Sequence, residues 1–179
     1  ILGVQPVCNH IAHRWSSSES VTNCIQVLMD VREIEAVRES WRTAQMDRDQ
    51  FGTGFFTNMF EKFPHLQAYF TFLEGKSISE AAENTQLKYH GRNFSKAIDD
   101  IVNNLTDPDN LNKVIDHVGA IHDGMGIPLT DYKKVSTFFV DYLTLHVGKC
   151  DLKYTPTEIR DAWQKAVDTL VAGSAKYFV

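Results

Sequence analysis

The residues that decide the fold are 107–126, DPDNLNKVIDHVGAIHDGMG. Four residues in this stretch are spaced 4, 3 and 4 positions apart and therefore share one helical face: Leu111, Ile115, Val118 and His122. Gly124 and Gly126 follow, and glycine is a common residue just beyond the end of a helix. We therefore expect His122 in the last turn of a helix, on the side that faces the core.

A second histidine lies on a second apolar face, within residues 87–101, LKYHGRNFSKAIDDI. The residues that share this face are Leu87, His90, Phe94, Ile98 and Ile101. A buried imidazole without a partner costs about 1–3 kcal/mol, and a metal between His90 and His122 would satisfy both rings. Imidazole suits iron, and the 11 phenylalanines of the chain suit a planar porphyrin. The same spacing also fits two unrelated core histidines, each with a local hydrogen bond.

Helix-start signals recur along the chain. The candidate start residues are Asp30, Ser77, Asp107, Thr130 and Thr155. Ser77 is expected to open the segment that carries His90. No alternating strand pattern and no internal repeat appears in the sequence. We predict an all-α fold of six or more helices, with an N-terminal extension at residues 1–29 and a single domain at residues 30–179.

Composition excludes several classes of protein. The formal net charge of -5 argues against a nucleic-acid partner. No apolar run is long enough to cross a membrane. The three cysteines, Cys8, Cys24 and Cys150, are too scattered for a disulfide framework or a zinc site, so we expect free thiols in a reducing, cytoplasmic setting.

Taken in order, these features resemble the globin family over about residues 30–179. Phe70 follows Phe63-Pro64 at the position where globins place the phenylalanine that stacks on haem. The residues that carry the resemblance are Trp41, Phe63-Pro64, Phe70, Lys88-Tyr89-His90-Gly91, Phe94, Val118 to His122, Ile127-Pro128, Trp163 and Tyr177-Phe178. The resemblance implies a three-on-three helical sandwich that encloses haem b and binds oxygen, carbon monoxide or nitric oxide.

The resemblance also assigns site residues. His122 would be the proximal iron ligand, its other ring nitrogen donating to a carbonyl near Val118, and His90 would be the distal residue. The residues expected to contact the porphyrin are Phe56, Phe70, Phe94, Val118, Ile121, Ile127, Tyr132, Val135 and Phe139. Ordinary core packing is the alternative for most of them, and for Val135 and Phe139 the two interpretations weigh equally.

Two departures from the usual globin pattern affect the predicted site. Many globins carry a basic residue three positions after the distal histidine, where this chain has Asn93, so Lys88 or Arg92 is expected to reach a haem propionate instead. The 32 residues between His90 and His122 resemble neuroglobin-like and cytoglobin-like proteins. Many members of that group let the distal histidine bind iron directly.

Four functions remain open on the sequence. The first is a six-coordinate globin, with His90 and His122 on iron, in sensing, redox or nitric-oxide chemistry. The second is a five-coordinate oxygen carrier or store. The third is a nitric-oxide dioxygenase or peroxidase that needs an external electron-transfer partner. The fourth is a haem-free helical module, which the intact histidine pair disfavours. The sequence also leaves the oligomeric state open.

Overall fold

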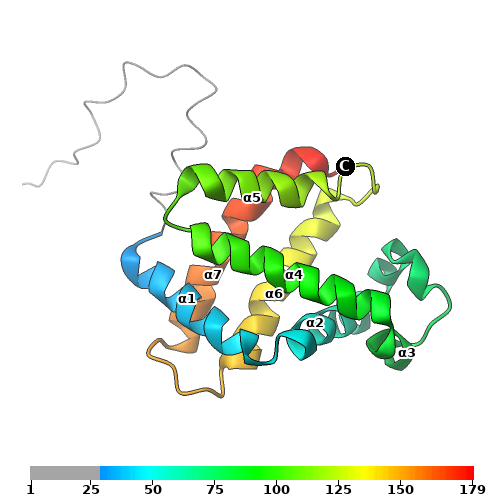
Figure 1. The fold of residues 1–179 in the computed structure, drawn as a ribbon, viewed down its shortest axis with the longest axis horizontal. Helices are drawn as coiled ribbons and strands as arrows, with labels where there is room; N and C mark the ends of the chain where they lie inside the picture. Colours follow the sequence, from blue (N-terminus) through cyan, green and yellow to red (C-terminus); the bar gives the residue numbers. More distant parts are fainter. Residues whose placement is uncertain (1–28) are drawn as a thin grey trace, which may run out of the picture.

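Seven α-helices and four short 3-10 helices form residues 29–179, the part of the chain that this computed structural model describes (Figure 1). The α-helices are α1 Val31–Ala44, α2 Arg48–Lys62, α3 Ile78–Glu83, α4 Thr85–Asn104, α5 Pro108–Ala120, α6 Leu129–Val147 and α7 Pro156–Ser174. The 3-10 helices are η3 Gln45–Asp47, η4 Pro64–Tyr69, η5 Thr71–Leu73 and η6 Ala175–Tyr177. No strand occurs among these residues, so the predicted all-α class is confirmed. Nearly all of the predicted extension, residues 1–29, lies outside the described residues, and its boundary stays a prediction.

The predicted helix starts are confirmed at three sites. Asp30 and Thr155 each form a complete capping box, in which the cap side chain and a glutamate three residues later bond to each other's backbone N–H groups. Asp107 caps α5 through the backbone N–H of Asn110, with proline in the first turn. These contacts satisfy N–H groups that have no partner inside a helix.

Two helix starts differ from the prediction. Ser77 does form a capping box, but it opens the short helix α3, and Asn84 caps the separate helix α4 that carries His90. The Asn84 side chain accepts two backbone N–H bonds in the first turn of α4, which makes a second start. Helix α6 begins at Leu129 after Pro128, two residues earlier than a cap at Thr130 would place it. The predicted cap was wrong because the preceding proline already supplies the extended residue that a helix start needs.

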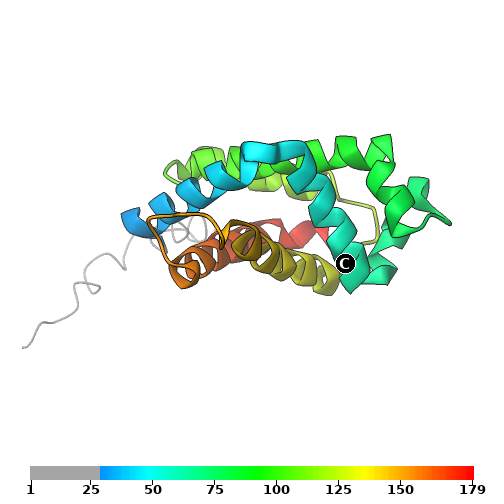
Figure 2. The same ribbon diagram turned by 90° about the horizontal axis from the view of Figure 1, so that it is seen from below.

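The helices pack in two layers. Seen from below, α1, α4 and α5 lie in one layer and α6 and α7 in the other, with α2 at the right of the view (Figure 2). Buried residues from these helices form one apolar core, in which Trp163 donates a hydrogen bond from Nε1 to Ser40 Oγ at 2.9 Å. Trp41 lies 6.0 Å from Trp163, ring centre to ring centre.

The crossing of α2 and α4 is made possible by two glycines. A Cβ atom on Gly52 would lie 2.4 Å from the backbone oxygen of Gly91, which is closer than any real contact. A Cβ on Gly91 would meet the Gly52 carbonyl carbon at 2.9 Å. Because both residues lack side chains, the two backbones touch. The close crossing brings His90, the residue before Gly91, against Phe56 of α2.

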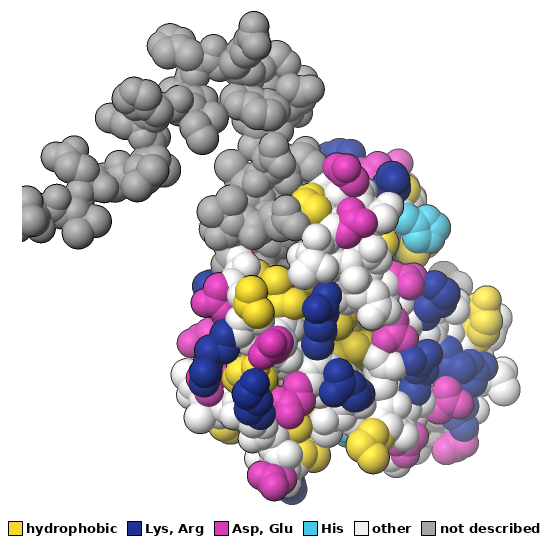
Figure 3. Space-filling model, turned by 60° about the vertical axis from the view of Figure 1, so that its left-hand side comes forward, with side chains coloured by type: hydrophobic (Ala, Val, Ile, Leu, Met, Phe, Trp, Pro, Cys, Tyr) yellow, Lys and Arg dark blue, Asp and Glu magenta, His cyan; other side chains and the backbone are white. Residues whose placement is uncertain are grey.

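Three further findings concern the surface charge, the length and hydropathy of the helices, and the cysteines. On the face drawn in Figure 3, basic and acidic side chains are interspersed, with no broad patch of one charge. None of the described helices is both long enough and apolar enough to span a bilayer. Cys150 is a free, exposed thiol after α6; the other two cysteines lie outside the described residues.

Candidate haem site

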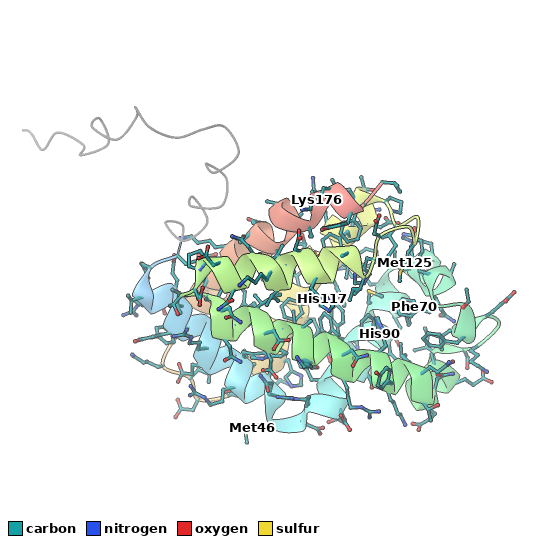
Figure 4. The ribbon with its side chains drawn as sticks, turned by 45° about the horizontal axis from the view of Figure 1, so that its top comes forward. Met46, Phe70, His90, His117, Met125 and Lys176 are labelled. Carbon is teal, nitrogen blue, oxygen red and sulfur yellow. The ribbon has the colours of Figure 1, made fainter. Side chains whose placement is uncertain are left out.

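His90 lies on α4 between two phenylalanine rings. Its ring centre is 4.7 Å from that of Phe56 on α2 and 5.2 Å from that of Phe70, which lies between η4 and η5. In Figure 4 the labels of His90 and Phe70 lie next to each other, to the right of the centre of the view. Burial, and to a smaller extent electrostatic repulsion from His122, lower the pKa of the His90 imidazole to about 4. At neutral pH the ring is therefore uncharged and carries a free lone pair.

The aromatic residues predicted for the distal side form one cluster with His90. Phe56 contacts Phe94 edge-on at 5.4 Å and Phe70 at 5.6 Å between ring centres. Phe94 in turn lies 5.6 Å from Phe139 of α6. The structure thus brings together residues from α2, α4, α6 and the segment before α3. These aromatic surroundings are apolar and offer His90 few polar partners.

His122 lies just beyond α5, not within its last turn as predicted. The helix ends at Ala120, and the His122 backbone N–H bonds to the Gly119 carbonyl, which tightens the chain into a turn. Gly124 and Gly126 both have positive φ, +74° and +68°, and they shape the corner that follows. The glycines therefore mark the corner, while the helix itself stops before it.

The predicted hydrogen bond of His122 is present. Its Nδ1 lies 2.7 Å from the backbone oxygen of Val118, one turn earlier. Because a carbonyl oxygen only accepts, Nδ1 carries a proton in this bond, and in the neutral imidazole Nε2 is then the nitrogen with the lone pair. A neutral imidazole whose second nitrogen is held by a carbonyl is the usual form of a metal-binding histidine.

The residues predicted for the proximal and rear walls are distributed around the α5–α6 corner. Tyr132 of α6 lies under Phe178, with ring centres 3.9 Å apart and an interplanar angle of 17°. Val135 is half-buried against the core, whereas Ile121 is 50% exposed. Ile127, half-buried in the corner, accepts a backbone bond from Val179.

The two candidate propionate partners already have carboxylate partners. Lys88 Nζ lies 2.7 Å from Glu83 Oε2, and Arg92 Nη1 lies 3.6 Å from Asp49 Oδ2. Both are ion pairs with exposed members, which contribute little to stability and are easily exchanged. A propionate role for either residue stays a prediction.

Sequence reasoning missed Phe178 as a residue of this site. Its ring centre is 6.0 Å from that of His122, at an interplanar angle of 33°. Phe178 follows the last helical turn and belongs to no periodic pattern. Only the folding back of the chain end brings it to His122.

Residues 53–174 match the family model described as Globin. The chain belongs to the globin family. It is 26% identical to Cytoglobin-1 of Danio rerio over 77% of this chain and 79% of that protein. It is 25% identical to a globin of Aplysia kurodai, over 80% of this chain and 94% of that one. The crystal structure of ferric Aplysia limacina myoglobin superimposes with a TM-score of 0.72 at 18% identity, covering 83% of this chain and 98% of that chain.

As a globin, the protein has the globin fold and is a haem-binding, gas-binding protein. Its own residues fit haem. The His90 imidazole, uncharged at neutral pH, lies within a cluster of phenylalanine rings, and His122 has its Nδ1 bonded to a carbonyl so that Nε2 can face a metal. Porphyrin needs these two features, an apolar crevice and a nitrogen ligand for the iron.

Proposed function

We propose that this globin binds haem b through His122 and that His90 occupies the sixth position on iron when no external ligand is present. Such a protein suits a sensing, redox or nitric-oxide-related role in the cytoplasm, with an external electron-transfer partner. Haem, when bound, supplies reversible coordination of a diatomic gas. The observation that carries the proposal is the uncharged His90 ring between Phe56 and Phe70.

The role of His122 follows from its tautomer. The bond from Nδ1–H to the Val118 carbonyl fixes the orientation of the ring and raises the electron density on Nε2. Nε2 is then the atom that would bind iron. Val118 therefore contributes through its backbone oxygen.

The case for a direct bond from His90 rests on burial. A half-buried imidazole between aromatic rings has few polar partners and gains most from a ligand that accepts its lone pair. The lowered pKa keeps that lone pair free of a proton at physiological pH. Iron held by His122 would supply the missing partner.

Direct coordination by His90 would make ligand binding competitive. An external gas binds only the fraction of molecules in which His90 has released the iron, so the apparent affinity falls by that fraction. Bulk oxygen storage gains nothing from this competition. In a sensor or redox protein, by contrast, the release of iron by His90 would itself be a change that reports ligand binding. A five-coordinate carrier, in which His90 donates a hydrogen bond to the ligand, is the alternative.

The test is the visible spectrum of the reduced, ligand-free protein. We expect two sharp, well-split bands from low-spin iron, and we expect His90→Leu to convert them to one broad band. His117→Leu is the matched control, because His117 is an exposed histidine on α5 (Figure 4). A broad band in the wild type would contradict the direct bond and favour the five-coordinate carrier.

A further inference from the structure

The chain end folds back onto the corner that follows His122. We use the name C-terminal clamp for residues 176–179. In Figure 1 the end marked C lies beside the corner between α5 and α6. The Val179 N–H donates to the Ile127 carbonyl at 3.2 Å, and the Leu129 N–H donates to the Val179 carbonyl at 2.6 Å. These two bonds join Val179 to the residues on either side of Pro128.

The bond to Leu129 closes the start of α6. The first N–H groups of a helix have no partner inside it, and Pro128, the residue before α6, provides no side-chain cap. The carbonyl of Val179 takes one of these N–H groups instead. Because the Val179 side chain is 80% exposed, Val179 itself contributes to the clamp through its backbone.

The clamp also holds the last turns of α5. The Tyr177 ring lies directly over Gly119, where an added Cβ would meet it at 2.2 Å. Lys176 Nζ forms an ion pair with Asp116 Oδ1 at 2.7 Å. Figure 4 shows Lys176 at the end of the chain that reaches this side of α5. The helix before His122 and the helix after it are thus tied to the same four residues.

Within the clamp, Phe178 is the residue that reaches His122. Its ring stacks on Tyr132 at 3.9 Å and tilts over His122 at 6.0 Å, measured between ring centres. His122 lies outside the regular helix, and the hydrogen bond to Val118 fixes one edge of its ring only. Tyr132 is itself held by a hydrogen bond from Ser174 Oγ to its hydroxyl at 3.3 Å.

We infer that Phe178 is a positioning residue for His122: stacked on Tyr132, it sets the tilt of the imidazole and hence the strength of its bond to iron. The inference rests on the proposed role of His122 as the iron ligand. It assigns to the C-terminal clamp a function in tuning ligand affinity from the proximal side.

The test uses the haem-loaded protein of residues 1–179. Phe178→Leu removes the stacked ring and keeps an apolar side chain. The matched control is Phe63→Leu, since Phe63 is also half-buried and contacts one aromatic ring, Phe138, edge-on at 6.0 Å. The readouts are the iron–histidine stretching band after photolysis of the carbon monoxide complex, the rate of haem transfer to an acceptor, and the melting temperature.

We expect Phe178→Leu to shift the iron–histidine band and to speed haem transfer by about two- to tenfold, the factor that corresponds to losing an aromatic contact. Phe63→Leu should leave the band in place. If Phe178→Leu lowers the melting temperature without moving the band, the residue is merely structural and the inference is wrong. Should Phe178→Leu fail to fold, Tyr132→Leu removes the other half of the stack and must shift the band in the same direction.

One further variant separates this inference from the proposed function. In His122→Gly, the iron–histidine band must disappear and return with added imidazole. A wild-type band that persists in His122→Gly would show that His122 is not the ligand, and both claims would fall. A band that depends on His122 but not on Phe178 would overturn the positioning role alone.

Discussion

His122 is held in place by groups that lie close to it in space but only partly in sequence. Val118 is one turn earlier on the same segment, so its carbonyl could be expected from helical spacing. The ring of Phe178 comes from the other end of the chain. The spacing of apolar residues thus singled out both histidines, the resemblance to globins predicted the Val118 bond, and neither had any means of predicting the aromatic contact.

At the residue scale, His122→Ala should abolish stable haem binding. A ligand that binds only the folded state stabilises that state, so loss of haem should also lower the melting temperature. The haem-to-protein ratio after gel filtration measures the first effect, and a thermal melt measures the second. His117→Ala, which removes an exposed histidine from the same helix, should retain haem. Full haem content in His122→Ala with an unchanged iron spectrum would refute the assignment.

At the scale of elements, the crossing of α2 and α4 decides where His90 lies. Each helix could be predicted from periodicity and caps, although the boundary at Asn84 was missed because Ser77 offers an equally good start. The contact between Gly52 and Gly91 was invisible in the sequence, because nothing in either helix shows which glycine meets which. Helix identity is local information, whereas helix packing is not.

The crossing leads to a prediction with a matched control. Gly52→Ala places a methyl group against rigid backbone and should destabilise the protein by about 1–3 kcal/mol, while displacing α4 and changing the spectrum. Gly54→Ala lies on the same helix, but its methyl group meets only the movable Tyr142 hydroxyl at 2.7 Å. Since alanine favours a helix by about 1 kcal/mol over glycine, Gly54→Ala should be close to neutral or stabilising. Urea unfolding compares the two, and equal losses would contradict the backbone contact.

The cap of α7 gives a prediction about pH. Backbone N–H donation from Thr155 and the bond from Arg32 of α1 lower the pKa of Glu158 to about 2, from an ordinary 4.5. Since the unfolded chain takes up this proton first on acidification, the stabilisation by Glu158 is complete above pH 4.5 and is lost as the pH falls towards 2.

Glu158→Gln should therefore lower the free energy of unfolding at pH 7, and its difference from wild type should shrink between pH 4.5 and pH 2. Urea titrations at a series of pH values measure this difference. Asp161→Asn, at an exposed carboxylate of the same helix, is the control and should show no such trend. A difference that stays constant with pH would mean that the charge of Glu158 contributes nothing.

At the scale of the whole molecule, the sequence predicted the class, the family and most of the helices. What it left out are the contacts that join distant parts of the chain: the glycine crossing, the C-terminal clamp and the end of α5 before His122. These contacts depend on the packing of the complete fold, whereas the spacing of apolar residues and the capping residues can be recognised within one segment of sequence. We also expect residues 1–29 to be dispensable for haem binding, because the resemblance to globins begins at about residue 30.

The two buried tryptophans, Trp41 and Trp163, should report haem occupancy through their fluorescence. Both connect to the haem site through Phe139, whose ring centre lies 6.5 Å from Trp41 and 5.3 Å from Trp163, and then through Phe94. Haem absorbs where indoles emit, so haem bound on the other side of Phe94 and Phe139 would take up the excitation energy of the two indoles. Replacing Trp15, the third tryptophan, by phenylalanine leaves only these two as emitters. Their fluorescence should be quenched in the haem-loaded protein and should increase as haem dissociates. Haem occupancy could then be followed in real time without a label.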